Sequence, residues 1–341
     1  MRFSLIVPVY NVERYVIDCL ESIKRQSFND YEVIIVNDGS TDSSVALCNQ
    51  FIQTNPDMKI RLISQHNHGL LLARRTGIRI AAGEYFVHID SDDMIREDAL
   101  ELLNDVIQRY SPDLILFRGS FSKSYSKCQL GSLPWKTSHV DQLNKTDVLG
   151  AFLDGYITSI WVKAAKKTCV DIERSYQGFE GITIGEDQLQ SIHLLDAAER
   201  IIYLDEALYY YRENASSSTS LFRPGKQAQY GRVKEAIYKA ALDWDSKYPG
   251  HSYGARALKS YLANAYYDIR KSAHASTFTR ELDELRATPL FQPSLKYLKE
   301  LRLDQRLFCK AVVMGWDGAA FVSCRIFRWL ESALRRLRHV C

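Results

Sequence analysis

The stretch "YFVHIDSDDM" (residues 85–94) joins an apolar, aromatic run to three carboxylates within four positions. The run is typical of a buried strand, and the carboxylates follow at its carboxyl end. Side chains repeat every second residue along a strand, so Asp90 and Asp92 project to the same side. Such a pair can hold Mg²⁺ or Mn²⁺, which use one or two carboxylates and complete their shell with water and phosphates. Helix capping is the alternative interpretation, and Asp98 has the position of such a helix-start residue.

Strand-like and helix-like segments alternate on the N-terminal side of this stretch. The predicted strands are residues 3–10, 31–37, 59–64 and 84–90. We expect a helix capped by Asn11 after the first strand, one capped by Asp42 after the second, and one closed by Gly83 before the fourth. This alternation indicates βαβ crossovers, and therefore an α/β fold with a doubly wound, mostly parallel sheet flanked by helices.

Polar residues gather where the predicted strands end. Asn11 follows the first strand, Asp38 the second, and Asp90 and Asp92 the fourth. In a doubly wound sheet, ligands bind beyond the carboxyl ends of the strands. These side chains therefore mark the expected site.

The rest of the chain changes character along its length. We predict a strand at 113–120, irregular structure at 119–145, a helix from Glu186 and Asp187 onward, strand or hairpin at 201–214, and only helices after "SSSTSLFRPGK". A boundary near Pro224 gives a catalytic-looking domain of residues 1–224 and a helical C-terminal extension of residues 225–341.

Charge is divided unevenly between these two parts. Residues 225–341 hold 21 Lys and Arg against 11 Asp and Glu, a balance of +10, whereas residues 1–224 hold 23 against 30, a balance of −7. The 341-residue chain as a whole has a net charge of only +3. An acidic half joined to a basic half suggests two separate tasks.

Composition narrows the class of protein. Apolar residues make up 46% and charged residues 25% of the chain, which is ordinary for a globular protein with a sizeable core. The seven cysteines are scattered without a CxxC pair, so we expect reduced thiols in a cytosolic protein. The N-terminal apolar run is too short for a signal segment, and we find no stretch near the ~20 apolar residues of a membrane span.

Other motifs near the expected site each have a functional and a structural interpretation. Asp38 can accept from the N–H of a pyrimidine base, or it can simply form a turn. Either Arg74 or Arg75 can reach a base or a diphosphate, unless both lie on a solvated helix face. Glu186 and Asp187 open a helix, where one of them is expected to interact with the helix dipole.

Taken together, the motifs resemble those of a known family. The segments "SLIVPVYNVERYVIDCLESIKRQSF", "EVIIVNDGSTDSS", "GLLLARRTGIRIAAGEYFVHIDSDD", "SIWVK" and "GEDQ" follow in the order of family 2 of inverting nucleotide-sugar glycosyltransferases, which have the GT-A fold. The resemblance spans residues 1 to about 217, including "YYYRENASSS", and leaves the remainder uncovered.

The resemblance implies roles for individual residues on the donor side. Pro8 and Asp38 would line the uracil and ribose pocket, with Arg74 beside it. Asp92 would bind the metal ion, and Asp90 would lie nearer the ribose while completing the D-x-D pair.

It also implies roles for residues around the transferred sugar. Asp187 would be the general base. Trp161 and Lys163 would approach the donor sugar or its phosphates. Asn11 and Glu186 complete the expected nucleotide-sugar-binding set.

Two positions depart from the family pattern. Asn37 stands where members often have a first aspartate, so a charge-dependent role at that position is in doubt. Leu71 and Leu72 replace the usual small residues before the helix arginine, which would narrow the donor site.

The activity implied by the resemblance is metal-dependent transfer of a hexose from a UDP-sugar to a saccharide hydroxyl, with inversion to a β-linked product and Mn²⁺ or Mg²⁺ as cofactor. The acceptor would be carried on a lipid such as undecaprenyl diphosphate, in bacterial surface polysaccharide synthesis. A nucleotidyltransferase is one alternative, although "PVYNVERY" lacks a Gly-rich and basic loop for a triphosphate. A non-catalytic sugar-nucleotide-binding subunit is the other.

The C-terminal stretch "VSCRIFRWLESALRRLRHV" has the pattern of an amphipathic helix. One arc contains Val322, Ile326, Trp329, Leu330, Ala333, Leu334 and Leu337. The other contains Arg325, Arg328, Glu331, Arg335, Arg336 and Arg338. This composition is typical of a helix on an anionic membrane surface, which predicts a cytoplasmic protein peripheral to the inner face of the cell membrane. Docking on the protein's own core is the alternative, and we expect no nucleic-acid partner.

Overall fold

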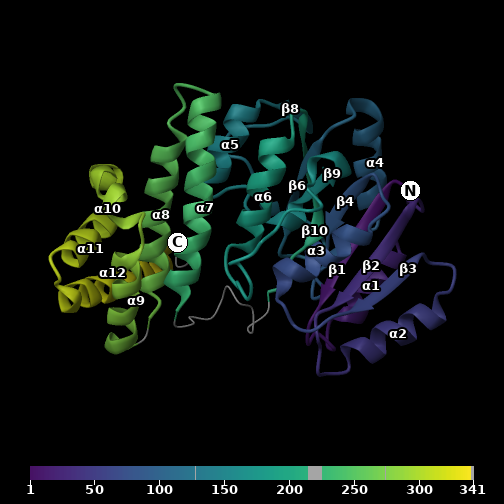
Figure 1. The fold of residues 1–341 in the computed structure, drawn as a ribbon, viewed down its shortest axis with the longest axis horizontal. Helices are drawn as coiled ribbons and strands as arrows, with labels where there is room; N and C mark the ends of the chain where they lie inside the picture. The colour runs from purple at the N-terminus through teal and green to yellow at the C-terminus, as the bar shows by residue number, and fades with distance from the viewer. Residues whose placement is uncertain (127, 214–224, 273, 339–341) are drawn as a thin grey trace. The chain divides into compact units, whose positions relative to one another are not determined.

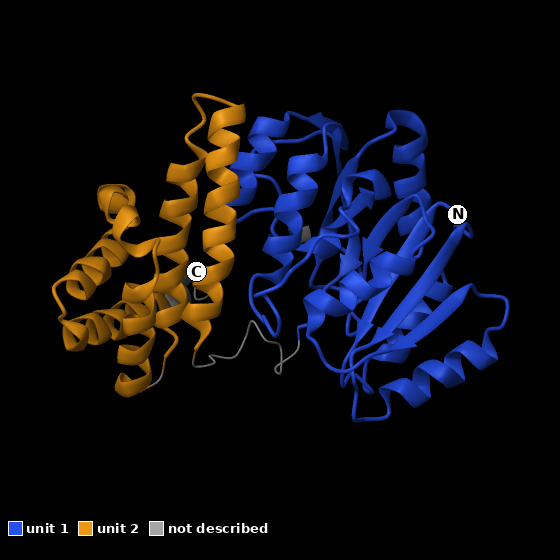
Figure 2. Cartoon of the chain, in the orientation of Figure 1, with its two compact units in different colours: residues 1–215 blue, residues 216–341 orange. Residues whose placement is uncertain are grey.

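A computed structural model of the chain describes residues 1–126, 128–213, 225–272 and 274–338 (Figure 1). The chain divides into two compact units, residues 1–215 (unit 1) and 216–341 (unit 2) (Figure 2). The boundary predicted near Pro224 falls in the segment 214–224, which lies outside the described residues, and it stays a prediction.

Unit 1 is built on one twisted sheet. Its strands are β1 (Phe3–Val9), β2 (Tyr31–Asn37), β3 (Ile60–Ser64), β4 (Tyr85–His88), β5 (Met94–Ile95), β6 (Leu114–Ser120), β7 (Cys128–Leu130), β8 (Val140–Leu143), β9 (Lys163–Lys166) and β10 (Ile201–Tyr210). The order is β3-β2-β1-β4-β9-β6-β10-β5, with β7 on β6 and β8 on β10. Strands β1 to β4 are parallel, β10 is parallel to β6, and β9 runs antiparallel between β4 and β6. The predicted α/β fold with a central sheet flanked by helices is confirmed, and the sheet is mixed, with its parallel part formed by β3-β2-β1-β4 and by β6 with β10.

Helices cover both faces of this sheet, as the alternation of side chains requires. They are α1 (Val16–Lys24), α2 (Ser44–Thr54), α3 (Leu70–Ile80), α4 (Ala99–Tyr110), α5 (Lys145–Leu153) and α6 (Glu186–Ala197), with short 3₁₀ turns η1 (Ile160–Val162) and η2 (Lys167–Cys169). Leu5 and Val7 pack in one cluster with residues of α1, α2 and α4, whereas Ile6 packs in a second cluster with Ala73 and Ile78 of α3. Neighbouring residues of β1 therefore bind helices to opposite faces.

Some local predictions are wrong, and the contacts explain why. The first helix begins at Val16, not after Asn11, because Asn11 adopts φ 51° and its side-chain oxygen accepts from the Thr41 N–H across the loop at 2.8 Å. Helix α3 ends before Gly83, where a Cβ atom would lie 2.5 Å from the Ser4 nitrogen. Gly83 thus allows close backbone approach to β1 and does not close the helix. The region 119–145 contains the short strands β7 and β8.

Unit 2 is helical throughout its described residues, 225–272 and 274–338, as predicted. Its elements are α7 (Lys226–Lys247), α8 (Tyr253–Ile269), α9 (Ala275–Ala287), α10 (Phe291–Ser294), η3 (Leu295–Glu300), α11 (Leu303–Val313) and α12 (Asp317–Arg338). Their core joins Tyr261 and Tyr266 of α8 to Phe278 of α9 and Phe308 of α11. The unit therefore has a hydrophobic core of its own.

None of the helices in the described ranges is both long enough and apolar enough to cross a membrane.

Candidate functional site

The acidic turn after β4 is held by the end of β10. Asp93 is 1% exposed, and its carboxylate accepts from the Tyr209 hydroxyl at 2.7 Å and from the Arg212 N–H at 2.8 Å. The same Tyr209 oxygen accepts from the Asp90 N–H at 3.0 Å. Burial, together with the charges of Asp92 and Asp90, raises the pKa of Asp93 well above its usual value. Asp93 is therefore an internal anchor that fixes the backbone carrying Asp90 and Asp92.

Arg212 holds the turn from a second direction. Its Nε donates to the carbonyl oxygen of Asp92 at 2.8 Å, and its guanidinium pairs with Asp18 of α1 at 2.8 Å. The guanidinium also lies 5.0 Å from the centre of the Tyr15 ring. Sequence reasoning gave Arg212, Tyr209 and Asp93 no role in holding this turn, although Arg212 follows the tyrosine run in "YYYREN", which was part of the resemblance.

Arg74 joins the acidic turn to the helix that begins at Glu186. Its guanidinium is 0% exposed and donates to Asp187 at 2.5 Å and to Asp90 at 2.6 Å. Burial disfavours the charged guanidinium, but Asp90 and Asp187 outweigh this, so the pKa of Arg74 is raised. The Arg74 guanidinium therefore brings together three predicted site residues, which come from α3, from the end of β4 and from α6.

Glu186, which begins the first turn of α6, has a raised pKa. Burial and the neighbouring Asp187 charge raise the pKa of Glu186 to about 7, against the lowering influence of Arg74. Burial also raises the pKa of Asp90. Asp187 itself accepts from the Ile160 N–H at 3.3 Å, which ties it to η1. The helix N-terminus adds a partial positive charge that favours the anion at this position.

Asp38 is engaged by the loop that leads into α3. It is 3% exposed, and its carboxylate accepts from the Gln65 side chain at 2.7 Å and from the N–H groups of His68 and Gly69 at 2.9 and 2.8 Å. These bonds shape residues 65–69 at the start of the helix that carries Arg74. Contact of Asp38 with a uracil base stays a prediction.

The remaining predicted residues at this end of the sheet have backbone-shaping contacts. Pro8 lies buried within β1 opposite Val36 of β2. Asn11 is exposed and bridges to the Asp38–Asp42 loop through Thr41. Asn37 accepts from the Ser40 N–H at 2.9 Å and donates to Ser64 at 3.1 Å, which gives this uncharged residue a turn-forming role.

Trp161 lies within η1, and Lys163 follows it as the first residue of β9. The Trp161 ring stacks on Tyr209 with 4.5 Å between centroids. Lys163 is 1% exposed, and its Nζ donates to the carbonyl oxygens of Ile157 and Ser159. Burial lowers the pKa of Lys163 to about 7. Both side chains thus position the turn whose Ile160 N–H contacts Asp187, and their predicted approach to the donor sugar stays a prediction.

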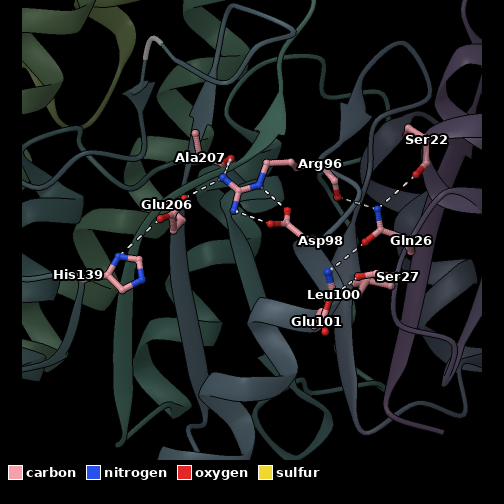
Figure 3. A network of polar contacts seen from close by, with 10 residues as sticks. All are labelled: Ser22, Gln26, Ser27, Arg96, Asp98, Leu100, Glu101, His139, Glu206 and Ala207. Carbon is pink, nitrogen blue, oxygen red and sulfur yellow. Dashed lines mark hydrogen bonds and ion pairs between the residues drawn. The ribbon is translucent and has the colours of Figure 1, made fainter.

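A network centred on Arg96 fixes the chain that leaves the acidic turn (Figure 3). Arg96 pairs with Asp98 at 2.5 Å and with Glu206 of β10 at 2.8 Å. Its carbonyl oxygen accepts from Gln26 at 2.7 Å, while Gln26 accepts from the Leu100 N–H at 3.0 Å. The network links β5, α4, β10 and the end of α1, so the acidic turn is held on both sides. Asp98 occupies the N-cap position of α4, as predicted, but its carboxylate makes no capping hydrogen bond and pairs with Arg96 instead.

The residues of the turn suit a divalent cation bound mainly by Asp92. Asp90 is committed to Arg74, whereas Asp92 is half-buried on a turn whose backbone is fixed by Arg212. Within the described ranges, no group of three or more His, Cys, Asp or Glu residues is arranged to bind a metal ion. A divalent cation can be held by one or two carboxylates and complete its shell with substrate phosphates, and Asp92 could supply one such carboxylate.

Comparison with known proteins gives the chain a family. Residues 4–167 match Glycosyl transferase family 2. The glycosyltransferase GlyA of Streptococcus pneumoniae is 35% identical over 351 residues, which cover 100% of this chain and 46% of GlyA. The chain thus spans about half of that relative. The putative glycosyltransferase EpsH of Bacillus subtilis is 31% identical over 94% of this chain and 93% of its own length.

Among solved structures, residues 1–349 of Staphylococcus aureus TarS in complex with UDP-GlcNAc align with a TM-score of 0.73 and 20% identity. The alignment covers 96% of this chain and 92% of the TarS chain. At this identity the similarity establishes a shared fold, of the GT-A type. The chain belongs to glycosyl transferase family 2.

Proposed function

We propose that this family member is an inverting hexosyltransferase, which moves a hexose from a UDP-sugar to a hydroxyl group of a saccharide. The observation that carries the proposal is the pairing of one buried arginine, Arg74, with both Asp90 and Asp187. It brings an acid at the carboxyl end of β4 together with an acid at the start of α6. Transfer requires such a meeting, because the donor phosphates and the acceptor hydroxyl must lie on either side of one carbon atom.

On the donor side, the acidic turn and the loop at Asp38 would hold the nucleotide. Asp38 shapes residues 65–69 next to the strand end where the uracil would lie. Asp92, on its fixed turn, would bind Mn²⁺ or Mg²⁺ together with the diphosphate. When bound, the ion neutralises charge that develops on the departing diphosphate. Arg74 holds Asp90 at 2.6 Å, and Asp90 would then contact the ribose.

On the acceptor side, Asp187 would take the proton of the attacking hydroxyl. Its place on the first turn of α6 and its bond from the Ile160 N–H hold the carboxylate in one orientation. A positioned base of this kind contributes about 10²–10⁴-fold to the rate. A single base with in-line displacement inverts the anomeric carbon, so an α-linked donor would give a β-linked product.

The UDP donor is supported by the fold shared with TarS, whose structures contain UDP-GlcNAc and UDP. For the acceptor we propose a lipid-linked saccharide intermediate of bacterial surface polysaccharide synthesis. The enzyme would then work as a peripheral protein on the cytoplasmic face of the cell membrane, where enzyme and acceptor share one surface.

The central test combines binding and turnover. Isothermal titration with UDP should give binding that strengthens when Mn²⁺ is added, and turnover of a UDP-sugar panel should release UDP. Asp187→Asn should lower transfer by about 10²–10⁴-fold, a far larger change than its effect on UDP affinity. Asp196→Asn, an exposed aspartate on the same helix, serves as the matched control.

Two results would contradict the proposal. Release of inorganic pyrophosphate from a nucleoside triphosphate would identify a nucleotidyltransferase instead. Near-normal transfer by Asp187→Asn would reduce this residue to a structural partner of Arg74.

A further inference from the structure

One side of helix α12 contacts its own unit. Ala320 and Cys324 are buried in the core of unit 2, Phe321 packs on Phe278 of α9 with 5.1 Å between ring centroids, and Asp317 forms an ion pair with α9. Further along, Glu331 pairs with Arg270 at 3.1 Å. At about 100° per residue these positions share an arc of about 100°. The helix therefore docks on its own unit, as one of the two interpretations of the sequence predicts.

The apolar arc predicted from the sequence lies on roughly the opposite side of the helix. Val322, Ile326 and Trp329 are 55%, 52% and 69% exposed, and Leu330 is exposed as well. These side chains fall within an arc of about 100°. Ala333, Leu334 and Leu337 also belong to the predicted arc, but their side chains lie outside the described part of the structure. Docking and exposure of the apolar arc thus occur on the same helix, and one does not exclude the other.

The turn before α12 extends this apolar surface. Met314 and Trp316 are both exposed, and the Trp316 N–H donates to the Ala311 carbonyl oxygen at 2.9 Å, which fixes the turn. Single exposed apolar residues are ordinary, but several within one short stretch of the chain, two of them tryptophans, indicate an interaction surface.

Positive charge lies on one flank of these apolar side chains. Arg325 and Arg328 are exposed beside them, and Arg328 also donates to the Arg270 carbonyl oxygen at 3.0 Å. From 325 to 338 the sequence contains five arginines and one acidic residue. Tryptophan with arginine around an apolar helix face is the composition of surfaces that enter the headgroup region of a bilayer.

We propose that this surface, the lipid face (Met314, Trp316, Val322, Ile326, Trp329 and Leu330), docks on an anionic lipid bilayer with α12 parallel to its plane. The charge selects this occupant, because the flanking arginines attract anionic headgroups while the apolar side chains enter the acyl boundary. The stripe of Ala320 and Cys324 keeps the opposite side of the helix attached to unit 2. The inference deepens the proposed membrane location, and only its purpose rests on the proposed function.

The test uses the full chain and vesicles of defined lipids. The wild type should co-sediment with vesicles made of equal parts phosphatidylglycerol and phosphatidylcholine, and much less with phosphatidylcholine alone. The double variant Ile326→Glu/Trp329→Glu should lower the partition coefficient by about tenfold or more. Raising the salt concentration from about 0.1 M to about 1 M should also weaken binding of the wild type. Leu242→Glu, at an exposed leucine of α7, is the matched control and should bind as the wild type does.

Several outcomes would overturn the inference. One is a double variant that pellets with anionic vesicles as the wild type does. Another is a lipid-free dimer, seen by sedimentation velocity, that the double variant dissociates, because the face would then bind a second copy. UDP-sugar turnover without lipid should be the same in both proteins. If the wild type binds vesicles but turns over no UDP-sugar, the proposed function fails and the lipid face stands.

Discussion

The two units place their unusual residues in opposite ways. In unit 1 the unusual residues are charges inside the protein, since Arg74, Asp93 and Lys163 are almost wholly buried. In unit 2 they are apolar side chains outside, since Trp316 and Trp329 are 62% and 69% exposed. Both arrangements are unfavourable for an isolated folded chain. A site for a charged ligand and a surface for an apolar partner can therefore be recognised by opposite departures from ordinary burial.

Burial of a charged side chain does not by itself identify a ligand site. Glu281 of unit 2 is 0% exposed, but it accepts from the Gly225 and Gln227 N–H groups and so binds the first residues of α7. The burial of Glu281 is therefore explained by its hydrogen bonds within unit 2. Arg74 instead joins two acids from distant segments, Asp90 and Asp187, and leaves both partly exposed. The direction in which the partners of a buried charge face matters more than burial itself.

The largest expected effect on stability tests the buried cation. Arg74→Met would leave Asp90 and Asp187 without their counter-charge, and should lower the free energy of unfolding by about 3–5 kcal/mol. Native-state hydrogen exchange of β4 amides would measure the loss within unit 1. Arg79→Met, an exposed arginine on the same helix, should change little. Equal protection in both variants would mean that Arg74 is not essential to the packing of α3.

Arg212 offers a smaller and more specific effect. Arg212→Ala removes the donor to the Asp92 carbonyl, and should weaken Mn²⁺ binding in the presence of UDP by about tenfold, as loss of an outer support of a metal ligand does. Arg212→Lys keeps the charge near Asp18 and should recover part of the affinity. Isothermal titration measures both.

The control for Arg212 lies in the same sheet. Arg118→Ala removes an arginine that pairs with Asp205 at 2.6 Å, and should leave Mn²⁺ affinity unchanged. If Arg212→Ala also leaves it unchanged, then Tyr209 and Asp93 suffice to hold the turn.

A pH-dependent effect is expected from Glu186. Its pKa is about 7 in the folded protein and 4.5 for the ordinary side chain. Between these values the folded protein keeps a proton that the unfolded chain has lost, so this group makes stability fall as the pH rises. Glu186→Gln should remove the effect, and its melting temperature should gain on the wild type from about pH 5 to about pH 8. A constant difference between the two proteins across this range would contradict the raised pKa.

The smallest expected effect concerns the fold of unit 2. Trp329→Ser should change the free energy of unfolding by less than about 0.5 kcal/mol, because the side chain is 69% exposed. Trp244→Ser, at a tryptophan that is 1% exposed in the same unit, should cost about 3–5 kcal/mol. Urea unfolding measures both. A large loss for Trp329→Ser would show that this residue packs on the protein itself.

The sequence was informative where local pattern and long-range packing agree. The β-branched runs of β1 and β2 gave buried strands, and the acids at Glu186 gave the start of α6. Strand β9 has the sequence "KAAK", which carries no strand pattern, and it is extended because it pairs with both β4 and β6. Asn11 failed as a helix cap because its side chain bonds to a loop that no local rule could bring near.

The site shows the same division. Asp38, Asp90 and Asp187 could be predicted as site candidates because they stand at strand or helix ends, where side chains are expected to serve ligands. The linkage of Asp90 to Asp187 through Arg74 could not be predicted, since it depends on a helix packing beside two other segments. Arg212 lies 194 positions from its partner Asp18, and only the assembled tertiary fold places them together.

The guanidinium shared by two acids has a consequence for kinetics. When Asp187 is neutralised, the cation belongs wholly to Asp90, and the Asp187 charge that helps to raise the pKa of Asp90 is lost. Substitutions on the proposed nucleotide side and on the proposed hydroxyl side should therefore fail to add. The Arg74 side chain alone thus couples Asp90 to Asp187, and this coupling needs no movement of the backbone.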